Sequence, residues 1–352
     1  MRLGHIDQMK AIAILFMVEV HTAAILPPEG ITAGHHPAAF VAAAFGGMAA
    51  PLFVTVSGWG MHRGAKKRFA NGLNSPAWID WVLPRVVILT ACQFLVNFLV
   101  AADRGGRFEW HTPGVLTLLA IAAIFAPFIS RFTNQSLIPL FSVLALSPLF
   151  LGGINGSELS WFSRVDSVGS EEWLQRLLFN GTYPILPWLA FSTLGAIIAE
   201  SEKDFETRKN IMGTGMIIFL ISIGMSLYSE KPWALTEGEA VLTFFPTTTF
   251  FIFISAMFVL IAHELLLWNS KNKRIDLSVL ESSGRLTLSI YVLHFAVLGV
   301  AAEYMMNKPL LGIGAAFTVT IAHTLIWIPL AKLHQRYCPK MSIEELLRRV
   351  SN

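Results

Sequence analysis

The sequence predicts an all-α, polytopic membrane protein of about ten transmembrane helices with both termini in the cytoplasm. Three observations lead to this prediction. Hydrophobic residues make up 54% of the 352-residue chain and charged residues only 14%, whereas soluble domains carry about 25% charged residues. Long apolar runs recur from one end of the chain to the other. Lys and Arg are crowded in some connecting segments and sparse in others, as in helical membrane proteins.

The apolar segments are long enough to approach or cross the hydrocarbon core of a bilayer. Their expected ranges are residues 8–26, 38–61, 77–101, 114–130, 137–153, 182–200, 211–228, 244–267, 286–304 and 309–332. Re-entrant segments have the same pattern, so the count is approximate. We expect one membrane domain, residues 1–335, in an integral multi-pass protein, which would lie in the plasma membrane of a prokaryotic host.

The placement of Lys and Arg orients these segments. With the N-terminus inside, most of the 26 Lys and Arg residues fall in inner segments, including the Arg63–Arg68 cluster. Cytoplasmic loops carry such an excess of positive charge. The net charge of +3 therefore reflects topology, and we expect no nucleic-acid partner.

Residues 336–352 form an expected cytoplasmic tail. Ser342 and Glu345 have the spacing of a capping box at the start of a helix. The apolar and basic residues behind them are typical of a short helix on the inner membrane surface. A solvated tail is an equally good interpretation.

The first span carries the most informative polar residues. Asp7, Lys10 and His21 share one helical face, and Lys10 and His21 are ~16 Å apart along the axis. A charge and an imidazole inside a membrane segment are costly, so each should have a partner or a function. A histidine near the bilayer middle can act as a general base or accept an acyl group. The alternative is a histidine that only packs helices.

Other candidates lie further along the chain. His35 and His36 follow the first span and are the main rivals of His21, although neighbouring histidines on a loop are more often inert. Arg85 lies in the inner half of the third span. It either extends to the inner boundary or, with Lys66, Lys67 and Arg68, lines a basic funnel for a phosphate-rich cofactor.

Two further positions have both a packing and a functional interpretation. Ser57 precedes Gly58, where close helix packing is the default explanation. Tyr291 and His294 lie three residues apart on one helical face and form either an interhelical pair or part of a cavity. No zinc-ligand spacing or Walker loop occurs in the sequence, so we expect no metal.

Five motifs occur in order between residues 6 and 294. Residues 6–21, IDQMKAIAILFMVEVH, resemble the D-x-x-R-G-I-A-x-x-x-M-V-x-x-H opening of the transmembrane acyltransferase superfamily. Four further segments resemble later motifs of this superfamily: PLFVTVSG at 51–58, YPILPW at 183–188 with Leu194-Gly195, FPT at 245–247 and GRLTLSIYVLH at 284–294. The sequence is most similar to the heparan-alpha-glucosaminide N-acetyltransferase catalytic-domain family, and more distantly to the acyltransferase type 3 family.

The resemblance implies that an acetyl group passes from cytosolic acetyl-CoA to an acceptor, a sugar or glycoconjugate, on the outer side. His21 takes the histidine position of the first motif and Lys10 its arginine position. Lysine keeps the charge but loses the bidentate fork of arginine. In the lysosomal branch the active histidine follows the first span, and His36 is the matching position here. Both histidines are therefore kept as catalytic candidates, with His21 ahead.

The hypothesis gives each candidate a role. His21 serves as general base or transient acetyl carrier, while Arg85 and the Lys66–Arg68 cluster hold the phosphates of acetyl-CoA. Lys10 and Ser57 are further cofactor contacts. The residues expected to contact the acceptor are Asp7, His35, Tyr183, Trp188, Tyr291 and His294.

Other partners and functions are also open at this point. The lipid bilayer surrounds the chain, and the small residues Gly46, Gly47 and Ala50 pack either a homodimer or neighbouring spans. A proton-coupled transporter would use Lys10, Glu19, His21 and the proline-broken spans, although no inverted repeat is visible. A non-catalytic scaffold predicts that His21→Ala leaves every activity unchanged.

Overall fold

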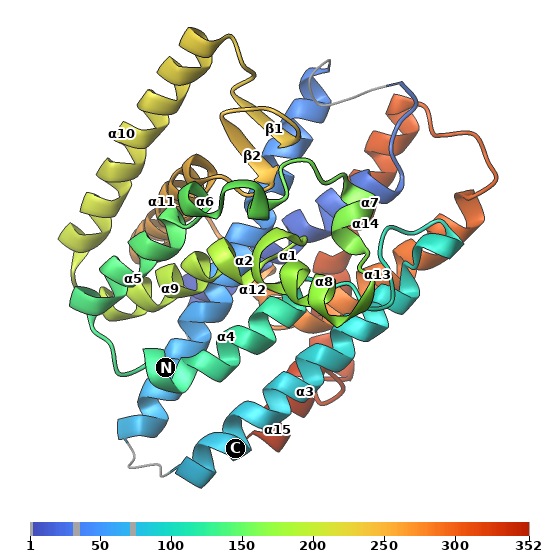
Figure 1. The fold of residues 1–352 in the computed structure, drawn as a ribbon. Coiled ribbons are helices and arrows are strands. Elements are labelled where there is room, and N and C mark those ends of the chain that lie inside the picture. Colours follow the sequence, from blue (N-terminus) through green and yellow to red (C-terminus); the bar gives the residue numbers. More distant parts are fainter. Residues whose placement is uncertain (1–2, 31–35, 71–74, 352) are drawn as a thin grey trace. The chain divides into compact units, whose positions relative to one another are not determined.

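The structure is a computed structural model that describes residues 3–30, 36–70 and 75–351 (Figure 1). Within these ranges nearly all regular structure is helical, as the sequence predicts. Seven of the described helices are long and apolar enough to cross a membrane, or up to nine if each of two bent helix pairs is one span. This is the architecture of an integral, multi-pass membrane protein. The expected count of about ten spans is not confirmed.

The chain divides into two compact units. The first unit comprises Met1–Phe53, Phe94–Thr112 and Ala262–Asn352. Its elements are α1 (Gly4–Ile25), the first part of α2 (Pro37–Ala70), the end of α3 (Ser75–Leu99), η1 (Ala102–Arg104), the end of α11 (Thr249–Asn272), α12 (Ser278–Gly284), α13 (Thr287–Met305), α14 (Ile313–Tyr337) and α15 (Ile343–Val350). Helix α1 packs against α12, α13 and α14, so its polar residues meet side chains from the C-terminal part of the chain.

Helices α1 and α12 touch through their backbones. A Cβ atom placed on Gly284 would lie 1.8 Å from the carbonyl oxygen of Asp7, so only glycine fits at this crossing. The glycine that opens the motif at 284–294 is thus explained by close packing. The same contact brings Arg285, the next residue, to the polar start of α1.

The C-terminal helix α15 is bonded to the start of α13. Ser342 Oγ caps α15 by accepting a hydrogen bond from the Glu345 amide at 3.1 Å, as the capping-box spacing predicts. The Glu344 carboxylate accepts hydrogen bonds from the amides of Leu288 (2.6 Å) and Ser289 (3.0 Å) and from the Ser289 hydroxyl (2.6 Å). These amides belong to the first turn of α13 and have no partner within the helix. The position of α15 on the membrane surface stays a prediction.

The second unit comprises Val54–Gln93 and Pro113–Ile261. Besides parts of α2, α3 and α11, it contains α4 (Val115–Ile129), α5 (Asn134–Leu146), α6 (Pro148–Leu151), η2 (Gly152–Asn155), α7 (Trp161–Val165), α8 (Gly169–Gln175), η3 (Arg176–Asn180), α9 (Ile185–Glu200), α10 (Phe205–Ser229), β1 (Ala234–Glu237) and β2 (Leu242–Phe245). The two short strands pair in parallel and were not expected from the sequence.

Several expected spans of this unit are interrupted. Helix α4 is short, with 15 residues, and α9 follows η3 through a bend of 46°. Proline lacks an N–H donor, and Pro148 and Pro184 stand at breaks of this kind. Apolar sequence alone does not show whether a segment runs straight through a bilayer, and these are the segments where the expected count is least secure.

Helix α9 forms the core of the second unit and packs against α4 and α5. It also crosses α2 closely. A Cβ on Gly195 would lie 2.1 Å from the Thr55 carbonyl oxygen, and one on Gly58 would lie 2.3 Å from the Ser192 carbonyl oxygen. The glycines of two separate motifs therefore serve one helix crossing, which confirms the packing interpretation of the Ser57-Gly58 position.

Candidate active site

His21 and His294 form the central contact of the first unit. His21 lies near the C-terminal end of α1 and is half-buried, whereas His294, on α13, is fully buried. The Nδ1 atom of His21 lies 3.0 Å from Nε2 of His294, and the two rings stack with centroids 5.2 Å apart. The structure thus joins two residues that the sequence placed 273 positions apart.

The hydrogen bonds of His294 determine which nitrogen of His21 is basic. His294 Nδ1 lies 3.0 Å from the Ile290 carbonyl oxygen, and a carbonyl oxygen can only accept. Nδ1 of His294 is therefore the donor, and in a neutral ring its Nε2 is the acceptor. His21 Nδ1 then donates to that Nε2, which leaves the Nε2 lone pair of His21 available. This is the arrangement of a general base held by a second group.

Aromatic rings surround this pair. The centroids of Tyr291 and Phe295 lie 6.1 Å and 4.5 Å from that of His21. Phe108 packs edge-on against Phe295. Arg107 donates to the Ala24 carbonyl oxygen at 3.2 Å, near the end of α1. Tyr291, which the sequence placed in the acceptor site, thus lies beside His21.

A third histidine lies next to the pair. The Thr22 hydroxyl donates to the Val18 carbonyl oxygen at 2.6 Å, so His323 Nδ1, 2.8 Å from the Thr22 oxygen, is the donor in that contact. The His323 ring centroid is 6.5 Å from that of His294. Nothing in the sequence around His323 on α14 indicates this contact with α1.

At the other end of α1, Asp7 connects two cations. Lys10 Nζ lies 3.8 Å from Asp7 Oδ1, and Arg285 Nε lies 3.5 Å from Asp7 Oδ2. Arg285 also pairs with Glu281 at 3.0 Å. A charge in a membrane segment is costly unless it is paired, and Lys10 is paired with the Asp7 carboxylate. The two residues lie on one helical face, as their spacing predicted. Arg285 was not singled out, although it follows the glycine of a recognised motif.

The remaining predicted residues of this unit are the two neighbouring histidines. His36 lies just before α2 and is half-buried. His35 lies outside the described residues.

Two of the expected cofactor residues meet on one aromatic ring of the second unit. The guanidinium groups of Arg85 and Arg68 lie 4.3 Å and 5.2 Å from the ring centroid of Trp81. Arg85 also donates to the Trp81 carbonyl oxygen at 2.6 Å. Lys67 is exposed on α2. The association of Arg85 with the α2 cluster, which the sequence suggested, is thus present in the structure.

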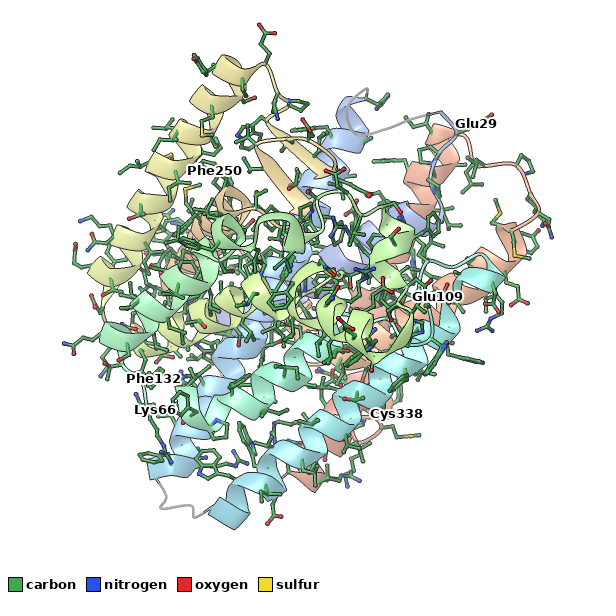
Figure 2. The ribbon with its side chains drawn as sticks, in the orientation of Figure 1. Glu29, Lys66, Glu109, Phe132, Phe250 and Cys338 are labelled. Atoms are coloured by element: carbon green, nitrogen blue, oxygen red, sulfur yellow. The ribbon has the colours of Figure 1, made fainter. Side chains whose placement is uncertain are left out.

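Lys66 has a different partner, and that partner leads to residues that the sequence did not indicate. Lys66, near the C-terminal end of α2 (Figure 2), lies 2.6 Å from Glu200 Oε2. Glu200 Oε1 also lies 2.8 Å from Nε2 of His62, which is 2% exposed. The available signal was a histidine one turn before a lysine at the end of an expected span, but the carboxylate partner of this histidine is 138 residues away.

Tyr183 and Trp188 are part of an aromatic cluster in the second unit. Their rings meet edge-on with centroids 4.9 Å apart, and Phe244 and Phe251 complete the cluster. Trp188 is fully buried and donates to Thr247 Oγ1 at 2.9 Å. These contacts are those of core residues, so an acceptor contact by Trp188 would require the cluster to open.

The family of the protein follows from comparison with known sequences. The model of an acyltransferase domain matches residues 3–331, which is nearly the whole chain and runs from α1 into α14. The chain belongs to this acyltransferase family. No curated protein matches the sequence significantly. The chain is thus a membrane acyltransferase, and the transporter alternative is not favoured.

Proposed function

We propose that this acyltransferase moves an acetyl group from cytosolic acetyl-CoA to a sugar acceptor on the outer side, as in the heparan-alpha-glucosaminide N-acetyltransferase family. His21 is its general base, and both termini lie in the cytoplasm. The observation that carries the proposal is the contact between His21 and His294. A half-buried imidazole whose second nitrogen is held by a buried partner is suited to take a proton from a hydroxyl or amine.

The acceptor meets His21 through the Nε2 lone pair. The proton of the acceptor hydroxyl or amine moves to Nε2, while Nδ1 stays bonded to His294. His294 is a positioning residue, because it acts on the reacting atoms only through His21. Tyr291 and Phe295 restrict water around the imidazole and help to keep it neutral.

Acetyl-CoA supplies the acetyl group as a thioester. The acceptor oxygen or nitrogen forms a bond to the acetyl carbon, the carbon–sulfur bond breaks, and the proton taken up by Nε2 passes to the departing CoA thiolate. Arg68 and Arg85, stacked on Trp81, offer two guanidinium groups for its phosphates, and arginine is suited to bidentate phosphate contacts. Lys66 fits this role less well because Glu200 already neutralises it. The donor site that we propose therefore rests on Arg68 and Arg85, with Lys67, Lys10 and Ser57 as secondary contacts.

The test is an acetyl-transfer assay with purified protein in lipid nanodiscs, labelled acetyl-CoA and glucosamine or a related sugar. His21→Ala should lower kcat by about 10²- to 10⁴-fold, the usual contribution of a general base. His36→Ala, the matched control, should leave kcat near that of the wild type. Label on the wild-type protein without acceptor would make His21 an acetyl carrier instead.

Two results would contradict the proposal. Loss of activity in His36→Ala alone would move the catalytic base to the start of α2. A wild-type protein that neither binds nor turns over acetyl-CoA would show that this member of the family uses another acyl donor.

A further inference from the structure

Arg164 is a buried cation that has no ionic partner among the described residues. It lies on α7, outside the helices that are long enough to cross the membrane, and is 1% exposed. Its Nη1 donates to the Asn180 carbonyl oxygen at 3.0 Å, and its Nη2 donates to the Gly156 carbonyl oxygen. Its Nε is buried and unpartnered among the described residues. The described contacts of this guanidinium are therefore with two neutral carbonyl oxygens.

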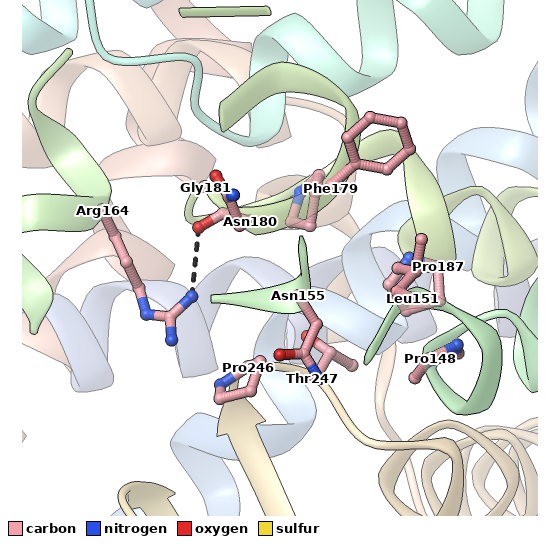
Figure 3. A pocket seen from close by; sticks show the side chains of 11 residues that line it. Pro148, Leu151, Asn155, Arg164, Phe179, Asn180, Gly181, Pro187, Pro246 and Thr247 are labelled. Atoms are coloured by element: carbon pink, nitrogen blue, oxygen red, sulfur yellow. Dashed lines mark hydrogen bonds between the residues drawn. The ribbon is translucent and has the colours of Figure 1, made fainter. Parts of the chain in front are cut away.

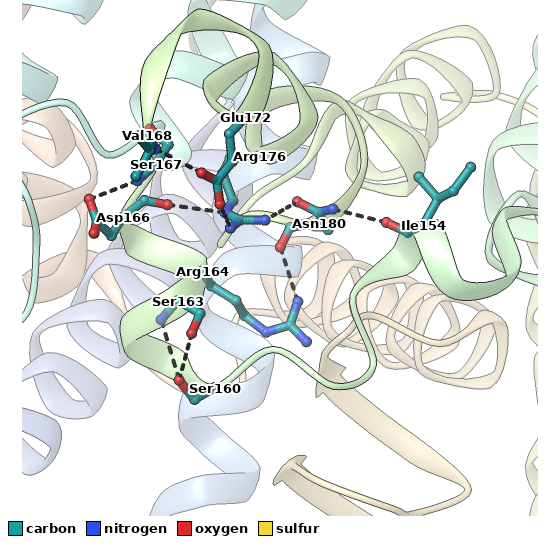
Figure 4. Close-up of polar contacts among 10 residues, drawn as sticks. All are labelled: Ile154, Ser160, Ser163, Arg164, Asp166, Ser167, Val168, Glu172, Arg176 and Asn180. Atoms are coloured by element: carbon teal, nitrogen blue, oxygen red, sulfur yellow. Dashed lines mark hydrogen bonds and ion pairs between the residues drawn. The ribbon is translucent and has the colours of Figure 1, made fainter.

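The neighbouring Arg176 shows what a paired arginine looks like here. Arg176 forms an ion pair with Glu172 and donates to Asn180 Oδ1 at 2.9 Å (Figure 4). Two guanidinium groups thus converge on Asn180, but the contacting carboxylate serves only one of them. Within the part of the chain that the structure describes, no carboxylate lies within ion-pair distance of Arg164.

The charge on Arg164 persists at neutral pH. Burial lowers the pKa of its guanidinium to about 10, with the negative charge of Glu237 opposing this change and the positive charge of Arg176 adding to it. A buried charge that lacks a counter-ion is strongly unfavourable. Glu237 is exposed and acts from a distance, so it does not replace a contacting anion.

Arg164 lines a small pocket of the second unit (Figure 3). Asn155, Asn180 and Thr247 add polar groups to its wall, and four prolines form much of the remainder: Pro148, Pro184, Pro187 and Pro246. Proline has no N–H donor. Thr247 already donates its hydroxyl proton to the Phe244 carbonyl oxygen. Among the residues that line the pocket, Arg164 is the one with a positive charge.

We propose that this pocket binds an anionic group, a carboxylate, sulfate or phosphate, and that Arg164 is its binding residue. The proposal goes beyond the proposed function, because it concerns a pocket of the second unit alone. An oxyanion would accept a hydrogen bond from Nε and neutralise the guanidinium, which is the pairing that arginine favours. The prolines would shape the pocket without competing for the anion.

Binding can be measured without catalysis, by thermal unfolding of the purified protein in detergent at constant ionic strength. Three probes separate the sources of the anion: inorganic sulfate, glucuronate and glucose. Glucuronate should raise the melting temperature and glucose should not. Arg164→Gln should raise the Kd for glucuronate by about tenfold or more. Arg104→Gln, which removes a cation from the first unit, should leave it unchanged.

Arg164→Lys covers the case in which the glutamine variant does not fold, because it keeps the charge and loses the fork. It should bind glucuronate more weakly than the wild type. Equal melting temperatures of the wild type with sulfate, glucuronate and glucose would overturn the proposal, and so would unchanged anion binding in Arg164→Lys and Arg164→Gln. Sulfate binding that Arg164→Gln weakens, without glucuronate binding, would support the anion site and identify its ligand as a free inorganic anion.

Activity separates this inference from the proposed function. Glucuronate binding without acetyl transfer to glucosamine would sustain the anion site and refute the proposed function. Acetyl transfer without glucuronate or sulfate binding would sustain the proposed function and refute the anion site.

Discussion

His21 and His62 are both histidines of apolar helices with one ring nitrogen bonded to another side chain, but their partners differ. His21 contacts the imidazole of His294, which already donates to a carbonyl oxygen, whereas His62 contacts the carboxylate of Glu200. A carboxylate stabilises a protonated imidazole, and a neutral imidazole does not. His21 is half-buried and His62 is 2% exposed. A polar partner alone therefore does not identify a catalytic histidine. The identifying features are the charge of that partner and the access of a substrate to the second ring nitrogen.

Apart from the loss of His21 itself, the largest fall in kcat is expected from His294→Phe, which tests whether His21 depends on its neutral partner. The substitution removes the acceptor that holds His21 Nδ1. Loss of one buried hydrogen bond costs about 1–3 kcal/mol, which corresponds to about 5- to 150-fold in kcat. The measurement is kcat for acetyl transfer, compared with the wild type.

His294→Gln is the matched control. Its side-chain oxygen can accept from His21 Nδ1 while its NH₂ group donates to the Ile290 carbonyl oxygen. Activity should therefore recover in part, and a merely structural role for His294 would not show such a rescue. Equal losses in the phenylalanine and glutamine variants would argue against a positioning role.

The same residues show which features of the site could be predicted from the sequence. The stripe of Asp7, Lys10 and His21 could be predicted because one helix with a known period carries all three. The pair of Tyr291 and His294 was recognised as one helical face for the same reason. Their meeting with His21 depends on the packing of α1 against α13, which helical periodicity alone does not specify.

Residues joined across long sequence separations were missed for that physical reason. Glu200 is the last residue of α9, and a carboxylate at the end of a span is common in a membrane protein. It nevertheless pairs with His62. Arg285 reads as one more inner cation until Gly284 brings α12 against α1. Arg164 reads as a loop arginine, because burial of a loop cannot be judged from its composition. The number of spans is not confirmed for a similar reason, because hydropathy does not resolve proline-containing bends.

A smaller effect, on stability rather than rate, is expected from His62→Leu. The variant removes the hydrogen bond to Glu200, and Glu200 keeps Lys66. We expect the free energy of unfolding to fall by about 1–3 kcal/mol, with kcat unchanged in the folded protein. Glu200→Gln should give a similar loss, and the double variant less than the sum, because the two residues share one contact.

The readouts are thermal unfolding and acetyl-transfer kinetics on the same preparation. Unchanged stability with a large fall in kcat would make His62 a second catalytic base. The distinction between the two histidines would then be wrong, since a charged partner and deep burial would be compatible with catalysis.

The smallest effect is expected from Glu344→Ala, which tests how the helix of His294 is held. Glu344 caps the first turn of α13, five residues before His294, and loss of such a cap costs about 0.5–2 kcal/mol. Hydrogen exchange should increase at the Leu288 and Ser289 amides, with a smaller fall in kcat than in His294→Gln. Glu345→Ala is the matched control, because the Glu345 carboxylate pairs with Arg348 and Arg349 of α15 itself. A fall in kcat as large as that of His294→Phe would mean that the placement of α13, rather than the charge of the partner, determines whether His21 can act as a base.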